Sequence, residues 1–243
     1  MSGLHIVPLS GGKDSSALAL RLAEMNPGTE YTYLFTPTGD ELPEMNAHLD
    51  RLAKMLGKPI FRKRHKHNLN GMIEQFQALP SWRMRWCTRM LKIEVAKAFY
   101  LDNPGSVAYV GLRADEEQRK GGIYGEDVEQ RYPLREWGWG VDEVWEYLKE
   151  RGVTIPRRTD CARCYDQQIG EWWNLWKDHP EIYADAEAQE EKYGHTFRSD
   201  RRDTWPAALK ELRLKFEAGG VPRGADCQQE MFDDGRKCRV CSL

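Results

Sequence analysis

Hydrophobic residues fall into short apolar runs that alternate with stretches of helical periodicity. Apolar residues recur at helical spacing directly after the first run, and again over Met45–Leu56 and Leu91–Ala98. Strands that alternate with helices predict an α/β fold, in which helices cover both faces of a parallel sheet. The runs with the length and composition of buried strands are residues 4–9, 31–36, 59–61 and 107–111.

The pattern changes toward the C-terminus. Two helical stretches rich in Trp, Glu and Ala are expected near 168–193 and 205–217. The segment 218–243 is rich in Gly, Asp and Cys and has no periodicity. We therefore predict an α/β body over residues 1–155 and a helical, cysteine-bearing region over residues 156–243.

The first apolar run leads directly into Ser10-Gly11-Gly12-Lys13-Asp14-Ser15, and a helical pattern follows. A helix N-terminus offers unpaired N–H groups and partial positive charge, and two glycines let an anion approach the backbone. Ordinary capping of a tight turn is the alternative, because Asp14 and Ser15 are good helix starters. The full hexapeptide between strand and helix favours a phosphate cradle. It matches neither the Walker loop nor the fingerprint G-x-G-x-x-G.

Two other strand ends carry candidate ligand-binding residues. The second run continues into Thr38-Gly39-Asp40-Glu41, and the fourth into Gly111, Arg113 and Arg119. Ligands of parallel sheets bind beyond the carboxyl ends of the strands, and guanidinium groups match tetrahedral oxyanions. A solvated turn and surface arginines are the plainer interpretations of these segments.

Six cysteines are present: Cys87, Cys161, Cys164, Cys227, Cys238 and Cys241. Two C-x-x-C pairs, Cys161–Cys164 and Cys238–Cys241, could close a four-thiolate site for zinc or iron–sulfur. Cys87 lies among cationic residues, which favours its thiolate form. Free or redox-active thiols are the alternative, and a structural cysteine is the plainer interpretation of Cys87.

The hexapeptide resembles the PP-loop, S-G-G-x-D-S, of the ATP pyrophosphatase superfamily. Within that group the chain is similar to the phosphoadenosine phosphosulfate (PAPS) reductase family. The turn Thr38–Glu41 looks like the family's D-T-G-x-E, with Pro37 where the first aspartate usually stands. Trp86-Cys87-Thr88 with Leu91-Lys92 resembles W-C-T-x-x-L-K, and Gly111–Arg119 fits G-x-R-x-x-E-x-x-R. The resemblance covers residues 4–155 and implies a Rossmann-like, PP-loop fold that binds an adenine nucleotide.

The resemblance also implies roles for single residues. Lys13 would neutralise phosphate charge, and Asp14 would cap the turn or hold Mg²⁺ beside ATP. Arg113 and Arg119 would contact the leaving pyrophosphate or a sulfate. The remaining residues expected beside the nucleotide are Ser10, Gly11, Gly12, Ser15, Thr38, Gly39, Glu41 and Gly111.

Iron–sulfur members of the family bind a 4Fe–4S cluster through a Cys-Cys pair and a later C-x-x-C. Here Trp86 stands beside Cys87 in place of the second cysteine, so a C-terminal cysteine must supply the fourth ligand. The prediction is a 4Fe–4S cluster, with zinc as the alternative. Its ligands would be four of Cys87, Cys161, Cys164, Cys238 and Cys241, and Cys227 is a further source of the fourth ligand.

The favoured function is cleavage of ATP to pyrophosphate and AMP or an adenylylated acceptor, in sulfur or nucleic-acid-modification chemistry. The reductases' C-terminal E-C-G-x-H motif is absent, which moves the prediction away from PAPS reduction. A true PAPS or APS reductase that releases sulfite through Cys238 or Cys241 is one alternative. A nucleotide-binding subunit of a CRISPR, anti-phage or DNA-modification system is the other.

A formal net charge of −2 gives no global attraction to nucleic acid. The run 62–67, Arg-Lys-Arg-His-Lys-His, is either a solvated face or a contact for a nucleic acid or protein partner. No apolar run reaches the roughly 18 residues that span a bilayer, and no signal peptide is recognisable. We therefore expect a cytoplasmic protein with no membrane partner, and a homodimer is left open.

Overall fold

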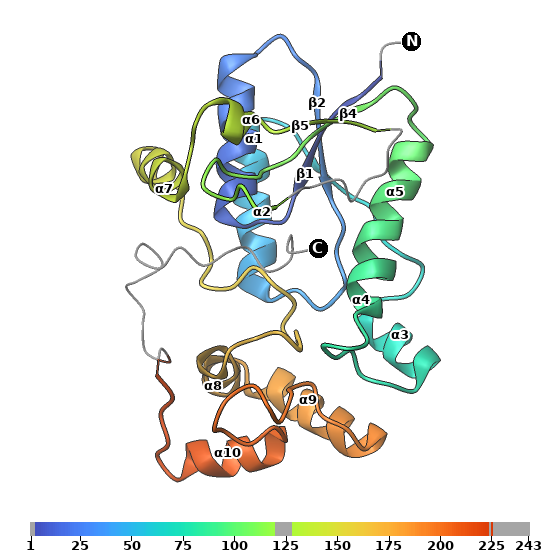
Figure 1. Cartoon of the computed structure of the whole chain (residues 1–243), viewed down its shortest axis with the longest axis vertical. Coiled ribbons are helices and arrows are strands. Elements are labelled where there is room, and N and C mark those ends of the chain that lie inside the picture. Colours follow the sequence, from blue (N-terminus) through green and yellow to red (C-terminus); the bar gives the residue numbers. More distant parts are fainter. Residues whose placement is uncertain (1–2, 120–127, 224, 226–243) are drawn as a thin grey trace.

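The computed structural model describes residues 3–119, 128–223 and 225. At its centre the described residues form a five-stranded sheet in the order β3-β2-β1-β4-β5, with all neighbouring strands parallel (Figure 1). This confirms the predicted α/β class. The strands are β1 (His5–Leu9), β2 (Tyr31–Phe35), β3 (Ile60–Arg62), β4 (Val107–Tyr109) and β5 (Glu129–Arg131).

Four of these strands lie where the apolar runs predict them, although the run 107–111 ends as a strand at Tyr109. The fifth strand, β5, was missed. Its three residues are Glu, Gln and Arg, and it pairs only with β4 at the edge of the sheet. An edge strand that buries little apolar surface has no hydrophobic signature in the sequence.

Helices cover both faces of the sheet (Figure 1). Helix α1 (Lys13–Met25), α2 (Pro43–Leu56) and α7 (Val141–Glu150) share one core with Val7, and α5 (Glu94–Leu101) shares another with Ile6. Adjacent residues of β1 therefore face opposite layers. Burial on both faces explains why the strands are continuous apolar runs rather than alternating ones.

Shorter elements complete the body: α3 (Leu69–Phe76), α4 (Trp86–Thr88), η1 (Arg89–Ile93) and α6 (Pro133–Glu136). The segment η1 is a single π-helical turn that leads into α5. In the C-terminal region lie α8 (Ile169–Asp178), α9 (Pro180–Tyr193) and α10 (Leu209–Glu217). The stretch 168–193, expected as one helix, is two helices, because Pro180 lacks an N–H group and disfavours helical geometry at His179.

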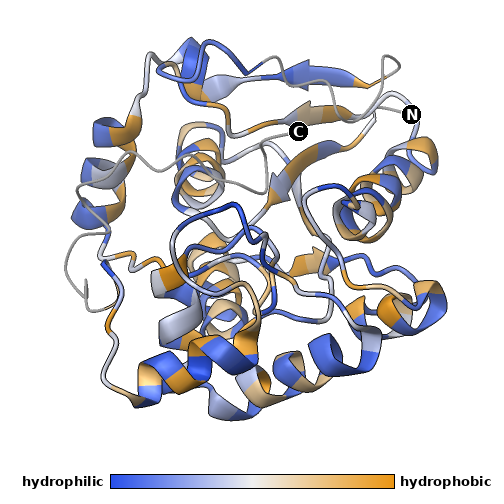
Figure 2. Cartoon of the chain, turned by 60° about the horizontal axis from the view of Figure 1, so that its bottom comes forward, coloured by the Kyte–Doolittle hydropathy of each residue, from blue (hydrophilic) through white to orange (hydrophobic). Residues whose placement is uncertain are grey.

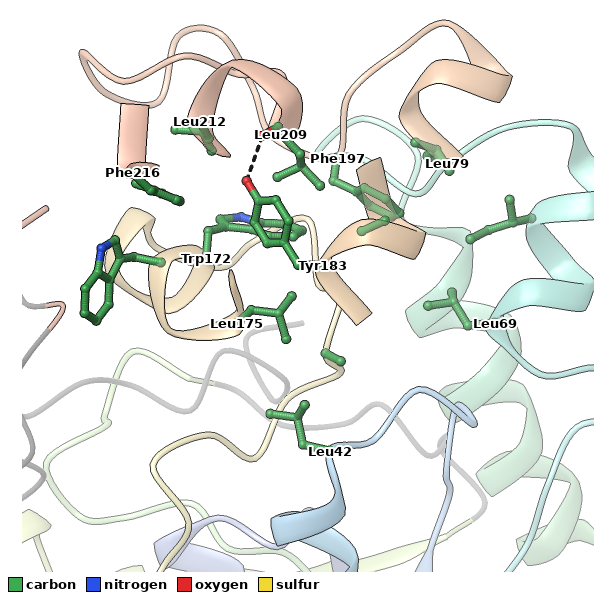
Figure 3. Packing of buried hydrophobic residues seen from close by; sticks show 14 of the residues in the cluster. Leu42, Leu69, Leu79, Trp172, Leu175, Tyr183, Phe197, Leu209, Leu212 and Phe216 are labelled. Carbon is green, nitrogen blue, oxygen red and sulfur yellow. Dashed lines mark hydrogen bonds between the residues drawn. The ribbon is translucent and has the colours of Figure 1, made fainter. Parts of the chain in front are cut away.

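The C-terminal helices form a further hydrophobic core with part of the body (Figure 3). Trp172 of α8 packs against Tyr183 of α9, whose hydroxyl donates a hydrogen bond of 2.8 Å to the carbonyl oxygen of Leu209. Leu42 and Leu69 extend this core into the body. Seen from below, in Figure 2, these helices carry both hydrophilic and hydrophobic stretches, as expected for helices buried on one side. The boundary near residue 155 stays a prediction.

Glu190 of α9 lies in this core and is 8% exposed. Its two carboxylate oxygens accept hydrogen bonds from the backbone N–H groups of Phe197 and Leu209, at 2.9 and 2.7 Å. Burial raises the pKa of Glu190 to about 7. Because the folded state then binds a proton that the unfolded state has released, the free energy of unfolding should fall by about 3 kcal/mol as pH rises from about 4.5 to 7.

Urea unfolding at several pH values measures this slope. Glu190→Gln, which cannot ionise, should remove the contribution, whereas the exposed neighbour change Glu191→Gln should leave the slope unchanged. An identical pH slope in wild type and Glu190→Gln would show that this carboxyl does not titrate in that range.

Candidate active site

The glycine-rich hexapeptide joins the carboxyl end of β1 to α1, at the point where the strand order reverses between β1 and β4. Gly11 has φ of +75°, a left-handed conformation that L side chains rarely adopt. A Cβ atom there would lie 2.0 Å from Cε of Met45. The turn therefore needs glycine at this position for its backbone, whereas the flexible end of Met45 could move away from an added Cβ atom.

Two serine hydroxyls fasten the turn. The N–H of Ser10 donates to Oγ of Ser15 at 3.2 Å, and that hydroxyl donates to the carbonyl oxygen of Gly12 at 3.1 Å. The N–H of Gly12 donates to Oγ of Ser10 at 3.3 Å. Gly12 is the N-cap residue of α1 and has no side chain to cap it. The end of α1 is thus held in place without a capping side chain, which suits an anion at that point.

Asp14 and Arg113 form a buried ion pair behind the turn. Nη1 of Arg113 donates to Oδ2 of Asp14 at 3.0 Å, and Nε donates to Oδ1 of Asp115 at 2.8 Å. Burial raises the pKa of Asp14, and Lys13 and Arg113 oppose that rise. The other oxygen of Asp14, Oδ1, is buried and has no hydrogen-bond partner within the described residues. A buried carboxylate oxygen is therefore available beside the glycine-rich turn.

The second glycine turn is held by its own glutamate. Oε1 of Glu41 accepts hydrogen bonds of 2.6 Å from both the N–H and the hydroxyl of Thr38, and Oε2 accepts one of 3.0 Å from the N–H of Gly39. Gly39 has φ of +79°. The Thr38 hydroxyl also lies 3.1 Å from Sγ of Cys161, so the turn contacts the C-terminal region directly.

A cavity, here called the nucleotide cavity, opens between these elements. Apolar side chains, among them Leu34, Phe35 and Ala96, line it together with polar ones. An apolar lining with a few polar groups is the usual composition of a ligand pocket. The polar side chains that line it include those of Ser10, Asp14, Ser15, Glu41, Thr88, Lys92 and Thr159, and the glycines Gly12 and Gly111 line it as well.

A second cavity, here called the cysteine cavity, adjoins the first. Cys87, Cys161 and Cys164 all line it, and Thr88, Lys92 and Cys161 line both cavities. Burial raises the pKa of the Cys87 thiol, and that of Cys161 to about 12, so these thiols are neutral without a metal. Over residues 3–119, 128–223 and 225, no three His, Cys, Asp or Glu side chains stand close enough to hold a metal ion as arranged. Cys227, Cys238 and Cys241 lie outside the described residues.

Lys92 is the cation between the two cavities. It belongs to the π-helical turn η1, an element that often marks functional sites because it re-aims a side chain within a helix. Burial disfavours its charge, but the carboxylates around it, Asp160 and Glu41 among them, raise the pKa of Lys92 above its usual range. Lys92 therefore stays charged where the two cavities meet.

A buried ion pair fixes the cysteine loop to the body. Nε of Arg163 donates to Oδ1 of Asp40 at 2.8 Å, and the Arg163 backbone N–H donates to Oδ2 at 2.9 Å. The N–H of Ala162 donates to the carbonyl oxygen of Asp40 at 2.7 Å. These bonds hold Cys161 and Cys164 beside the second glycine turn.

Residues 5–157 match the sequence profile of the phosphoadenosine phosphosulfate reductase domain. The chain belongs to this family. A stretch of 194 residues is 25% identical to an uncharacterised protein of Methanocaldococcus jannaschii, covering 73% of this chain and 39% of that protein. Over 102 residues it is 32% identical to argininosuccinate synthase of Bacillus velezensis, covering 41% of this chain and 23% of the synthase. The chain thus spans less than half the length of these curated relatives.

Two solved structures resemble this PAPS reductase-family chain. The U34-tRNA thiolase NcsA of Methanococcus maripaludis, solved with its 4Fe–4S cluster, aligns over 100% of this chain and 82% of its own, with a TM-score of 0.50 and 14% identity. The PAPS reductase of Candida auris, solved with phosphate, aligns over 64% of this chain and 75% of its own, with a TM-score of 0.49 and 15% identity. At such identity the likeness to the thiolase shows the fold.

The structure brings most of the predicted site residues of this family member to the two cavities. Arg113 is the main departure from the expected picture: it is 2% exposed, is bonded to Asp14 and Asp115, and does not line the nucleotide cavity. Arg119 donates to Oε1 of Glu116 at 2.7 Å. A direct contact of either arginine with pyrophosphate or sulfate stays a prediction.

Sequence reasoning named no site role for Lys92, Thr88 or Thr159, and it missed the pair of Asp40 with Arg163. Lys92 could have been found, since it ends the W-C-T-x-x-L-K segment. The pair joins residues 123 positions apart, for which the sequence carries no local signal.

The basic run 62–67 lies at the end of β3, away from both cavity linings. Nη2 of Arg62 donates to Oδ1 of Asp50 at 3.0 Å, and Nζ of Lys63 lies 3.8 Å from Oδ2 of Asp102. Part of its charge is thus neutralised within the chain. None of the helices in the described ranges is both long and apolar enough to cross a membrane.

Proposed function

We propose that the protein cleaves ATP between its α and β phosphates, transferring the adenylyl group to an acceptor and releasing pyrophosphate. The observation that carries the proposal is the glycine-rich turn at the switch point of the sheet, which lines the same cavity as Lys92. Catalysis of phosphoryl and adenylyl transfer depends mainly on positioned charge.

The glycine-rich turn and Lys92 would act on different parts of the nucleotide. The turn Ser10–Ser15 would hold the polyphosphate, with Lys13 neutralising charge on the departing pyrophosphate. The acceptor attacks the α phosphorus as the bond to the bridging oxygen of pyrophosphate breaks, and that oxygen takes the electron pair. Lys92 lies where it would stabilise charge on the α phosphate as the acceptor approaches from the cysteine cavity.

Mg²⁺ fits this site. It binds through one or two carboxylates together with substrate phosphates and waters. Oδ1 of Asp14 is a buried carboxylate oxygen without a hydrogen-bond partner in the described part of the chain, and Asp14 lines the nucleotide cavity. Asp14 would hold the ion beside the phosphates.

The cysteine cavity fits a thiolate-bound cofactor by its donor set, because three partly buried cysteines from two distant segments line one cavity. Cys87, Cys161 and Cys164 would hold a 4Fe–4S cluster, or zinc, together with a cysteine from the C-terminal segment. A cluster there would supply redox or sulfur-binding chemistry beside the nucleotide. Lys92, charged at the border of both cavities, would favour thiolates over thiols.

The test is an anaerobic assay of purified protein with ATP and Mg²⁺, in which AMP and pyrophosphate are quantified. Once an acceptor is present, we expect pyrophosphate in an amount equal to the sum of adenylylated acceptor and AMP, the AMP being released when the adenylylated acceptor reacts further. ATP binding should be measurable without an acceptor. The absence of both ATP binding and AMP formation would contradict the proposal.

The family's description favours a second function, reduction of PAPS. That activity would release sulfite from PAPS with thioredoxin as reductant. It should disappear in Cys238→Ser or Cys241→Ser if either cysteine is the nucleophile. Sulfite release without AMP formation from ATP would replace the first proposal with this one.

A further inference from the structure

An exposed aromatic and cationic surface lies beside the cysteine cavity and has no part in the proposed chemistry. It is the loop between α3 and α4, residues 77–85, at the margin of the molecule next to the C-terminal helices (Figure 1). Trp82 is 67% exposed and Met84 44% exposed. Two large apolar side chains exposed in one loop are a candidate contact surface, because covering them removes apolar area from water.

The charge around this loop is strongly one-sided. The charged residues of the loop 77–85 are Arg83 and Arg85, and the nearest acidic residue before it in the sequence is Glu74. The chain as a whole has a formal net charge of −2. Glu74 already faces Lys192, with Nζ and Oε1 3.8 Å apart. Arg83 and Arg85 form no ion pair within the described ranges of the chain. The surface is therefore complementary to a polyanion.

Arg85 connects the exposed tryptophan with the active site. Its guanidinium carbon lies 5.9 Å from the centroid of the Trp82 ring, and the same residue lines the cysteine cavity. Nε of Arg85 is buried without a hydrogen-bond partner in the described residues. Arg85 therefore belongs both to the exposed surface and to the lining of the cysteine cavity.

We infer that this loop binds single-stranded nucleic acid, with one base stacked on Trp82 and the backbone phosphates held by Arg83 and Arg85. A flat aromatic ring flanked by arginines fits an unpaired base and its phosphates, whereas an acidic peptide would need the cations alone. The inference rests on the proposed function and names its acceptor. The acceptor would be a nucleotide of the bound single strand, which enters the cysteine cavity.

Binding is measured without ATP, by fluorescence anisotropy of labelled oligouridine and oligothymidine of roughly 15 nucleotides. Trp82→Ala should weaken binding about tenfold, the size of loss expected for one stacked base, and Trp82→Phe should restore most of it. Arg83→Ala should reduce the slope of log K against log salt by about 0.7. Two controls remove an exposed apolar or cationic side chain elsewhere, Leu214→Ala and Arg51→Ala, and should change binding less than twofold.

Equal affinity for a duplex of the same length, or unchanged binding by Trp82→Ala, would overturn the inference. So would a polyglutamate peptide that displaces the oligonucleotide at equal charge concentration, since it would identify an acidic protein as the partner. The binding measurement contains no ATP, so it does not depend on catalysis. If the protein bound the oligonucleotide but did not cleave ATP, the proposed function would be contradicted and the binding inference would stand.

Discussion

Replacing Asp14 by asparagine should lower the rate of ATP cleavage by roughly 100- to 1,000-fold, the cost of removing one positioned charge from such a site. The change removes the negative charge that faces Lys13 and Arg113, and it removes the buried oxygen offered to Mg²⁺. The fold should survive, because Arg113 keeps Asp115 at 2.8 Å and Glu116 at 4.0 Å. Steady-state AMP formation at saturating Mg²⁺ measures the effect, with ATP binding followed separately.

Asp115→Asn is the matched control. It removes the other strong partner of Arg113, but Asp115 does not line the nucleotide cavity and is partly exposed. Its AMP formation should stay within about threefold of wild type, as for most exposed ion pairs. If both variants lose activity equally, the position of Arg113 rather than the carboxylate of Asp14 is what matters. Full activity in Asp14→Asn would exclude Asp14 from the mechanism.

The strands of the sheet could be predicted from the sequence where their burial requires a continuous run of hydrophobic residues. The apolar runs of β1 and β2 are buried on both faces, so their residues had to be continuously hydrophobic. Strand β5 satisfies its backbone by pairing with β4 while its polar side chains lie at the edge, so no apolar pattern was required. The break at Pro180 was predictable in principle, since proline begins helices readily and interrupts them elsewhere.

The site was predictable where backbone geometry dictates composition. The left-handed turns at Gly11 and Gly39 demand glycine, and these are the positions that the motifs mark. Long-range partners leave no such trace. Arg113 follows the fourth strand as expected, but only the fold shows that Asp14 occupies its guanidinium. Likewise, the border position of Lys92 arises from a π-helical turn, which has no periodic signature of its own.

Each of the single variants Cys87→Ser, Cys161→Ser and Cys164→Ser should lose the bound metal or cluster almost completely. The loss of metal affinity on removing a direct ligand should exceed the roughly 10- to 100-fold loss that follows mutation of residues that hydrogen-bond to the ligands. Protein purified without oxygen should show the broad visible absorbance of an iron–sulfur cluster and matching iron and sulfide content, and each variant should lose both. Circular dichroism distinguishes loss of the group from loss of the fold, because the helices of the body and of the C-terminal region dominate the far-ultraviolet signal.

The C-terminal cysteines supply the internal comparison. One ligand is still needed after the three thiols of the cavity, so among Cys227→Ser, Cys238→Ser and Cys241→Ser we expect one variant to lose the group and two to retain it. A colourless protein that contains zinc and needs the same three cysteines to hold it would support the thiolate site and identify its metal as zinc. Full metal content in all three cavity variants would show that the cysteine cavity holds thiols alone, and Lys92 would then face Cys161 as an unligated thiol beside the nucleotide.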